Sequence, residues 1–210
     1  MRVKICGITQ AEQAIAISQL GITTLGFICV PASERYISPT NLGNLLPQLP
    51  PDLSTVGVFA NENLDTISQI VTSTGLTAVQ LHGDESPQLC HLIRQSLPQI
   101  ELIKAFRLKN TADLSKIPDY YPWIDTILLD AYHPLRLGGT GKTLDWETLT
   151  QFTPPLPWLL AGGLSPQNIA QALQQLNPDG VDLSSGVERK PGDKDLELVR
   201  QLLATFVRKW

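Results

Sequence analysis

The chain has 210 residues, 42% of them hydrophobic, and a formal net charge of −4 at pH 7; this fits one folded core of ordinary composition. The negative charge excludes the basic surface typical of nucleic-acid-binding proteins, and no apolar run reaches membrane-spanning length. The three cysteines lie far apart in sequence, which excludes a disulfide framework or a clustered metal site and favours a reducing cytoplasm.

Short apolar segments alternate with helical patterns from one end of the chain to the other. Most of these segments are apolar throughout, as is typical of strands that are covered on both faces. Eight are predicted as strands: Arg2–Ile5, Thr24–Val30, Thr55–Phe59, Ala78–Leu81, Leu102–Ala105, Thr126–Leu129, Trp158–Ala161 and Gly180–Leu183.

Helix signals lie between the predicted strands. Thr9 and Glu12 fit a capping box, and three serines that precede a proline are predicted as N-caps: Ser38, Ser86 and Ser165. Helical spacing of apolar residues follows at 169, 172, 173 and 176, and again at 199, 202, 203 and 206. Eight strand–helix units without a linker predict an α/β fold, a single (β/α)8 TIM barrel over residues 1–210. A doubly wound open sheet is the alternative.

Polar side chains share one face of several predicted strands. Because side chains alternate along a strand, Arg2, Lys4 and Cys6 lie together, and the apolar residues Val3 and Ile5 are expected to face the helices. The same alternation is expected to turn a second set inward: Gln80, His82, Lys104, Asp130, Asp182 and Ser184. Charged groups inside a barrel must pair or serve a ligand. The interior is therefore predicted to hold an ion-pair network, such as Arg2 or Lys4 with Asp182, or a ligand site.

Cys6 closes the run Val3–Cys6 at the end of the first predicted strand, directly before Gly7. The C-terminal ends of barrel strands are where catalytic groups are placed, and an ammonium group from Lys4 on the same face would favour the thiolate that accepts a proton. A strand cysteine by itself is more often a small buried residue, and Cys29 and Cys90 are expected only to pack. Cys6 is therefore a candidate general base because of its position.

Asp130 closes the apolar strand that precedes it. Burial disfavours a charged carboxylate, which suits a general acid. The alternative is an N-cap or turn aspartate, but the residues after it do not resemble a helix start. His82, at the end of the fourth strand, is expected to position a ligand, with a catalytic base and a plain polar residue as alternatives.

Glycine-rich segments follow the last two predicted strands, with Gly162 and Gly163 after the seventh and Ser185 and Gly186 after the eighth. Barrels often bind phosphate at these two loops through backbone N–H groups, and glycine lets the backbone approach a ligand closely. Either segment alone would be a weak signal, because glycine also serves tight turns. Together they predict a phosphate site.

Two further loops bear on a ligand. The segment 138–143 imitates the end of a nucleotide-binding P-loop, but the pattern requires glycine where the chain has Arg136, and the dinucleotide spacing fails as well. It is predicted as a loop after the sixth strand that closes over the barrel. Arg35, after the second strand, could clamp a carboxylate with its planar guanidinium group; the alternative is a surface arginine.

Taken together, these motifs resemble one family, the phosphoribosylanthranilate isomerases, in order and over the whole chain. The segments that carry the resemblance are Lys4–Thr9, Ser33–Ile37, Val79–Gly83, Leu128–Asp130, Gly138–Lys142, Leu160–Leu164 and Asp182–Glu188. The resemblance implies an Amadori rearrangement of N-(5′-phosphoribosyl)anthranilate in tryptophan biosynthesis, without a cofactor or metal. Family members occur as monomers, dimers and fused chains, so a monomer or homodimer is expected.

The resemblance also implies roles for the candidate residues. Asp130 would be the general acid and Cys6 the general base, and Arg35 would hold the anthranilate carboxylate. The backbone at Gly162, Gly163, Ser185 and Gly186 would hold the phosphate; His82 matches an active-site position of undefined role. The alternatives are the related isomerisation in histidine biosynthesis, whose enzymes resemble a two-aspartate pair, and a barrel that binds a sugar phosphate without turnover.

Overall fold

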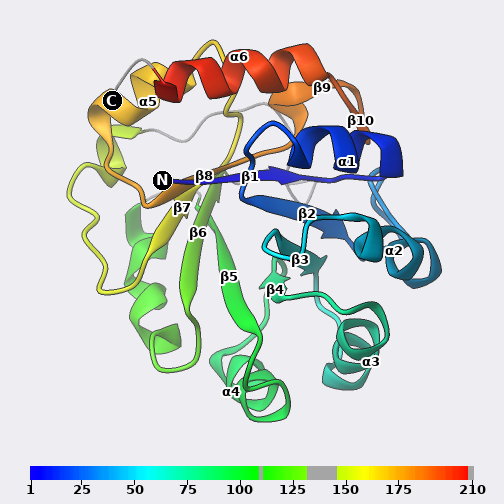
Figure 1. The fold of residues 1–210 in the computed structure, drawn as a ribbon. Helices are drawn as coiled ribbons and strands as arrows, with labels where there is room; N and C mark the ends of the chain where they lie inside the picture. The colour runs from blue at the N-terminus through cyan, green and yellow to red at the C-terminus, as the bar shows by residue number, and fades with distance from the viewer. Residues whose placement is uncertain (109–110, 132–145, 208–210) are drawn as a thin grey trace.

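The computed structural model describes residues 1–108, 111–131 and 146–207. Eight parallel strands form a closed barrel in chain order, with the first strand paired to the eighth (Figure 1). The strands are β1 (Arg2–Cys6), β2 (Thr24–Ile28), β3 (Ser54–Phe59), β4 (Ala78–Leu81), β5 (Glu101–Leu108), β6 (Thr126–Ala131), β7 (Trp158–Leu160) and β8 (Gly180–Leu183). The predicted barrel is confirmed, and every predicted strand overlaps an observed one.

Helices surround the barrel (Figure 1). The α-helices are α1 (Ala11–Ser18), α2 (Pro39–Leu45), α3 (Leu64–Thr74), α4 (Pro87–Ser96), α5 (Ile169–Gln175) and α6 (Leu196–Val207). Short 3-10 segments are η1 (Leu46–Gln48), η2 (Thr111–Tyr120), η3 (Trp146–Leu149) and η4 (Ser185–Val187), and the hairpin of β9 (Glu188–Lys190) and β10 (Asp193–Lys194) lies between β8 and α6. In the part of the chain covered by these ranges, no helix has the length and apolarity to cross a bilayer.

Two of the four predicted helix starts are confirmed. Ser38 and Ser86 accept hydrogen bonds from backbone N–H groups in the first turns of α2 and α4. The capping box at Thr9 is wrong, because its hydroxyl donates to the carbonyl of Gly192 instead. Ser165 is not an N-cap either, since α5 begins four residues later at Ile169. A long-range hydrogen bond at Thr9 and the loop geometry at Ser165 therefore outweigh the local capping patterns.

The apolar core has two parts. One fills the barrel and consists of Val56, Ala78, Ile103, Ala105, Leu128, Leu159 and Ala161; the larger part lies between strands and helices. Because Ile103 and Ala105 point inward, Lys104 must point to the helix side. Its ammonium group indeed bonds to Glu85 at 3.0 Å and to the carbonyl of Gly83. The prediction that Lys104 faces the interior is wrong, whereas the ion-pair reading of that residue holds.

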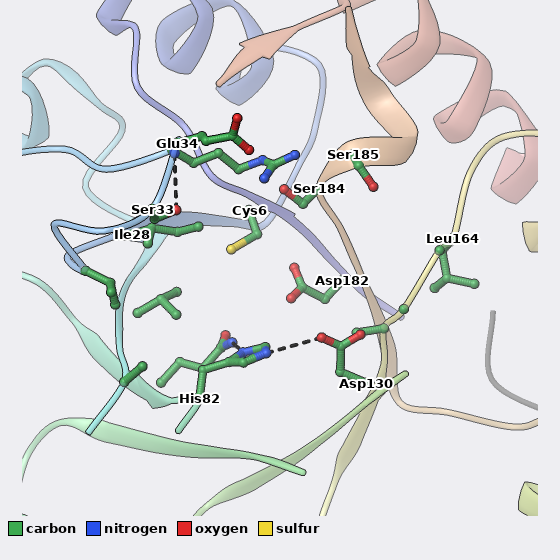
Figure 2. Close-up of a pocket in the computed structure, with 18 of the residues that line it drawn as sticks. Cys6, Ile28, Ser33, Glu34, His82, Asp130, Leu164, Asp182, Ser184 and Ser185 are labelled. Carbon is green, nitrogen blue, oxygen red and sulfur yellow. Dashed lines mark hydrogen bonds and ion pairs between the residues drawn. The ribbon is translucent and has the colours of Figure 1, made fainter. Parts of the chain in front are cut away.

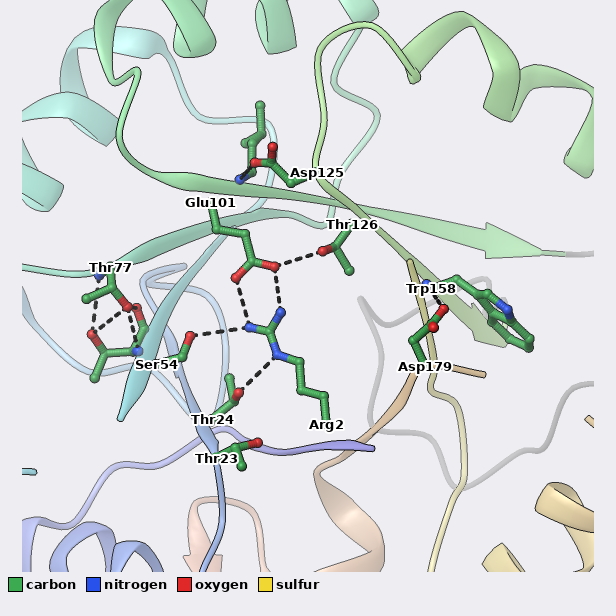
Figure 3. Close-up of polar contacts among 12 residues, drawn as sticks. Arg2, Thr23, Thr24, Ser54, Thr77, Glu101, Asp125, Thr126, Trp158 and Asp179 are labelled. Atoms are coloured by element: carbon green, nitrogen blue, oxygen red, sulfur yellow. Dashed lines mark hydrogen bonds and ion pairs between the residues drawn. The ribbon is translucent and has the colours of Figure 1, made fainter. Parts of the chain in front are cut away.

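The N-terminal end of the barrel is closed by a polar network around Arg2 (Figure 3). Its guanidinium group donates to both carboxylate oxygens of Glu101 on β5, to the hydroxyl of Thr24 on β2 and to that of Ser54 on β3. Thr126 on β6 also donates to Glu101. Arg2 therefore joins strands across the bottom of the barrel, and charge at this end serves stability.

Candidate active site

A pocket of about 450 Å³ opens at the C-terminal ends of the strands. Seven predicted site residues line it: Cys6, Arg35, His82, Asp130, Gly162, Gly163 and Ser185. Figure 2 shows Cys6, Asp182 and the His82–Asp130 pair around the same space. Gly186 is the exception and does not line the pocket. The segment 132–145, which includes the predicted closing loop, lies outside the described residues.

Cys6 is the last residue of β1 and is 6% exposed. Below it, the fully buried Lys4 bonds to Asp182 at 3.0 Å, which confirms one of the ion pairs that the sequence suggested. A Cβ atom added to Gly26 would lie 2.8 Å from the Cys6 sulfur and 2.9 Å from the Lys4 nitrogen. The thiol and the ammonium group therefore converge on one point of β2, and only glycine leaves that point open.

Burial raises the pKa of the Cys6 thiol above its ordinary value of 9.0. Lys4 and Lys194 act in the opposite direction and Asp182 adds to the rise. The effect expected from Lys4 is present, but desolvation outweighs it. In the absence of a ligand the neutral thiol is therefore the favoured form, and a thiolate requires further positive charge beside it.

Asp130, the penultimate residue of β6, lines the pocket and is 5% exposed. Its Oδ2 lies 3.2 Å from Nε2 of His82, whose Nδ1 lies 2.8 Å from the side-chain nitrogen of Gln80. Gln80 and His82 come from β4 and the residue after it, two positions apart and hence on one face. Sequence reasoning turned Gln80 inward but gave it no function; its contact with His82 links it to Asp130.

Arg35 is held in place by Glu188, a residue that sequence reasoning missed. The Arg35 Nε and Nη2 atoms lie 2.7–3.1 Å from the Glu188 carboxylate, and Lys194 lies 2.7 Å from the same group. Burial opposes the charges, but the two cations lower the pKa of Glu188, and Glu188 raises the pKa of Arg35. Lys194 also donates to the Cys6 carbonyl, so one buried cluster fixes both Arg35 and the end of β1.

The β9–β10 hairpin carries that cluster. Gly192 adopts φ +77° in its turn, and the Pro191-Gly192 pair between charged residues was a turn signal available in the sequence. No local pattern in the sequence shows what holds the hairpin in place. The side-chain oxygen of Gln13 on α1 accepts a hydrogen bond from the backbone N–H of Lys194, 181 positions away.

The loops after β7 and β8 meet beside the pocket. Gly162 and Gly163 adopt φ +87° and +65°, which favour glycine, and their N–H groups donate to no acceptor within the described ranges. A Cβ atom on Gly186 would lie 1.9 Å from the carbonyl oxygen of Leu164. Gly186 thus lets the two loops touch, and the free N–H groups can receive an anion.

Among the residues that the structure describes, no group of three or more His, Cys, Asp or Glu side chains could hold a metal ion.

The chain matches a family model described as N-(5′-phosphoribosyl)anthranilate (PRA) isomerase over residues 3–205. A Nostoc punctiforme relative named N-(5′-phosphoribosyl)anthranilate isomerase is 59% identical over 202 residues, which cover 96% of each chain. The crystal structure of phosphoribosyl anthranilate isomerase from Thermotoga maritima has a TM-score of 0.89 at 37% identity, covering 98% of both chains. Another, in complex with reduced 1-(o-carboxyphenylamino)-1-deoxyribulose 5-phosphate, has a TM-score of 0.86 at 35% identity and covers 98% of this chain and 97% of that one. The chain therefore belongs to the N-(5′-phosphoribosyl)anthranilate isomerase family.

Proposed function

We propose that the chain converts N-(5′-phosphoribosyl)anthranilate into 1-(2-carboxyphenylamino)-1-deoxyribulose 5-phosphate, an aldose–ketose isomerisation in tryptophan biosynthesis. One observation carries the proposal: the carboxyl group of Asp130 and the thiol of Cys6 line the same pocket. An isomerisation of this kind needs one proton donor and one proton acceptor and leaves no net change in protons or electrons. The complex in the 35% identical relative contains a reduced form of this product, which supports the choice of substrate.

The reaction begins with the acid. Asp130 gives its proton to the ring oxygen of the ribose, the bond from that oxygen to C1′ breaks, and the anthranilate nitrogen supplies the electron pair that forms a cationic Schiff base. This step requires a protonated carboxyl group at 130, and a general acid of this kind contributes about 10²- to 10⁴-fold in rate.

The base acts next. The Cys6 thiolate removes the proton from C2′, and the electrons of that bond move through C1′ to neutralise the Schiff base, which gives an enolamine. The enolamine then gains a proton at C1′ and loses one from the C2′ hydroxyl to become the ketone. Burial raises the pKa of the Cys6 thiol in the free enzyme, so formation of the thiolate requires positive charge nearby. In the complex, the cationic Schiff base and Lys4 would supply that charge.

The two ends of the substrate are anionic, and the two ends of the site suit them. Glu188 occupies the Nε and Nη2 edge of Arg35, so the Nη1 side remains for the anthranilate carboxylate. The N–H groups of Gly162 and Gly163, with Ser185 across the pocket, bind the phosphate. Gly186 contributes by allowing its loop to approach rather than by lining the pocket. Every group in this site comes from one chain, so a monomer or a homodimer suffices.

The test follows turnover of freshly generated N-(5′-phosphoribosyl)anthranilate by the loss of anthranilate fluorescence. We expect rapid turnover by the wild-type protein and a loss of about 10²-fold or more in kcat for Asp130→Asn, with a smaller change in KM, because the amide keeps the shape but has no acidic proton. A folded wild-type protein without turnover would contradict the function. Near-normal kcat in the variant would contradict the role of Asp130 alone.

A further inference from the structure

Gln80 is a buried polar side chain that the proposed reaction leaves without a task. It is 1% exposed, lies on β4 and lines the pocket. Its Oε1 atom is buried and has no hydrogen-bond partner in the part of the chain that the structure describes. A buried acceptor without a partner is destabilising, and an apolar residue of similar size would avoid that cost. The benefit must therefore come from its other atom, the amide nitrogen.

We propose that Gln80 is a positioning residue that sets the tautomer of His82, and thereby leaves the proton of Asp130 on the oxygen available to the substrate. The proposal rests on the proposed function, in which Asp130 is the acid. It assigns Gln80 no contact with the reacting atoms.

The donor and acceptor capacities of the Gln80, His82 and Asp130 side chains determine the tautomer. The Gln80 amide nitrogen lies 2.8 Å from Nδ1 of His82, and an NH₂ group can only donate. Nδ1 is then the acceptor, so the hydrogen of the neutral imidazole is on Nε2. That nitrogen lies 3.2 Å from Oδ2 of Asp130 and donates to it. With Oδ2 engaged as an acceptor, a protonated Asp130 carries its hydrogen on Oδ1.

The opposite tautomer would disable the acid. If the hydrogen were on Nδ1, the bare Nε2 would accept the proton of Asp130 and hold it away from the substrate. A Gln80 side chain with its oxygen toward Nδ1 would favour that arrangement. The orientation of one amide group therefore decides whether the acid points its proton at His82 or into the pocket.

The first test reads the tautomer directly. Two-bond proton–nitrogen NMR spectra of protein labelled with ¹⁵N-histidine report which ring nitrogen carries hydrogen, and a His82→Gln variant assigns the signals. We expect the Nε2–H form wherever the ring is uncharged. A neutral Nδ1–H form in the wild-type protein would overturn the inference. This measurement does not depend on turnover.

The second test exchanges the donor for an acceptor. Gln80→Glu keeps the shape but presents a carboxylate, which calls for hydrogen on Nδ1. We expect the NMR signals to report protonated Nδ1 and kcat to fall about 10²-fold, the low end for loss of a general acid, with KM within about two-fold. Gln69→Glu, the same change on the exposed face of α3, should leave both constants unchanged.

A third variant covers the case in which Gln80→Glu does not fold. Gln80→Met removes the donor without adding charge, so we expect a mixture of tautomers and a partial loss of kcat. Normal kcat in a folded variant with the changed tautomer would overturn the positioning role while the isomerase function stands. A wild-type protein with the Nε2–H tautomer but no turnover would contradict the proposed function, and with it the use of this tautomer.

Discussion

Residue 6 presents a thiol that burial keeps neutral, whereas the proposed reaction needs a thiolate. A hydroxyl group in the same position is a far weaker acid and holds its proton under all working conditions. We therefore expect Cys6→Ser to lose about 10²- to 10⁴-fold in kcat, measured in the fluorescence assay. Cys90→Ala is the matched control, because Cys90 is buried on α4 and does not line the pocket. Little effect of Cys6→Ser would require another base.

The pH dependence of the wild-type protein follows from the same residue. The thiolate fraction of the free enzyme rises with pH, and the pKa of Cys6 lies above 9.0. We expect the limb of kcat/KM that depends on the base to keep rising through the ordinary thiol range, because kcat/KM reports groups of the free enzyme. A base limb that levels off below pH 8 would contradict this assignment; the measurement is a kcat/KM profile in buffers of constant ionic strength.

In the proposed site Arg35 combines a ligand contact with its structural contact to Glu188, and two substitutions separate them. Arg35→Lys keeps a positive charge beside Glu188 but loses the planar fork, so we expect KM to rise about ten-fold with kcat little changed. Arg35→Ala should raise KM similarly and also lower the free energy of unfolding, because it removes one of the two cations that pair with Glu188. Chemical denaturation beside kinetics checks both. An unchanged KM in both variants would leave Arg35 a structural role only.

The meeting of Asp130, Cys6 and Arg35 at one pocket could be predicted because each lies at or after the end of a recognisable strand, and strand ends meet at one face of a barrel. The orientation of Lys104 was predicted wrongly, because its polarity was taken as the sign of an inward side chain. The apolar neighbours Ile103 and Ala105 are the residues that face the interior. Glu188 and Lys194 were missed because their partners, Arg35 and Cys6, lie 153 and 188 positions away. No local pattern contains such a contact.

At the scale of elements, one substitution is enough to disrupt the contact between the loops after β7 and β8. Gly186→Ala would place a methyl group 1.9 Å from the Leu164 carbonyl oxygen, so one loop must move. We expect a loss of about 1–3 kcal/mol in stability and weaker inhibition by inorganic phosphate, measured by denaturation and by competition kinetics.

The control for that change is Gly43→Ala. Gly43 lies in α2, and an added Cβ atom meets only a carbonyl oxygen of Ser73 at 3.9 Å. Since alanine favours a helix over glycine by up to about 1 kcal/mol, we expect equal or higher stability and unchanged phosphate inhibition. Unchanged inhibition in Gly186→Ala as well would separate this loop contact from the phosphate site.

The start of α5 shows why element boundaries were less predictable than elements. Ser165-Pro166 matched a helix start, but Asn168 accepts from the N–H of Ser165 and donates to the carbonyl of Gly163. That side chain builds a turn which keeps the glycine loop in shape, and it competes with the helix for the same backbone groups. A local cap signal does not reveal such competition.

At the scale of the whole molecule, buried thiols predict a loss of stability in alkali. Burial raises the pKa of Cys29 to about 12 and that of Cys90 to about 11. Above the ordinary value of 9.0 the unfolded chain releases these protons and the folded chain retains them. The unfolded state then binds fewer protons, and the free energy of unfolding falls as pH rises from about 9 toward 12.

Cys29→Val tests this sign. The variant should differ from wild type by less than about 1.5 kcal/mol at neutral pH, and its stability should fall less steeply in alkali by up to about 1.4 kcal/mol per pH unit. Urea denaturation at a series of pH values makes the comparison. Parallel curves for the two proteins would mean that Cys29 ionises equally in both states.

The ion pair of Lys4 and Asp182 spans 178 positions of the chain, and this has a consequence for synthesis on the ribosome. At about 5–20 residues per second, roughly 10–40 s pass between the emergence of the lysine and that of its partner. Throughout that interval β1 carries a charge that has no place in a dry interior, and its edge lacks β8. The nascent chain therefore cannot close the barrel or bury the Cys6 thiol early. The C-terminal end of the barrel, which holds the pocket, forms only after β8 has been synthesised.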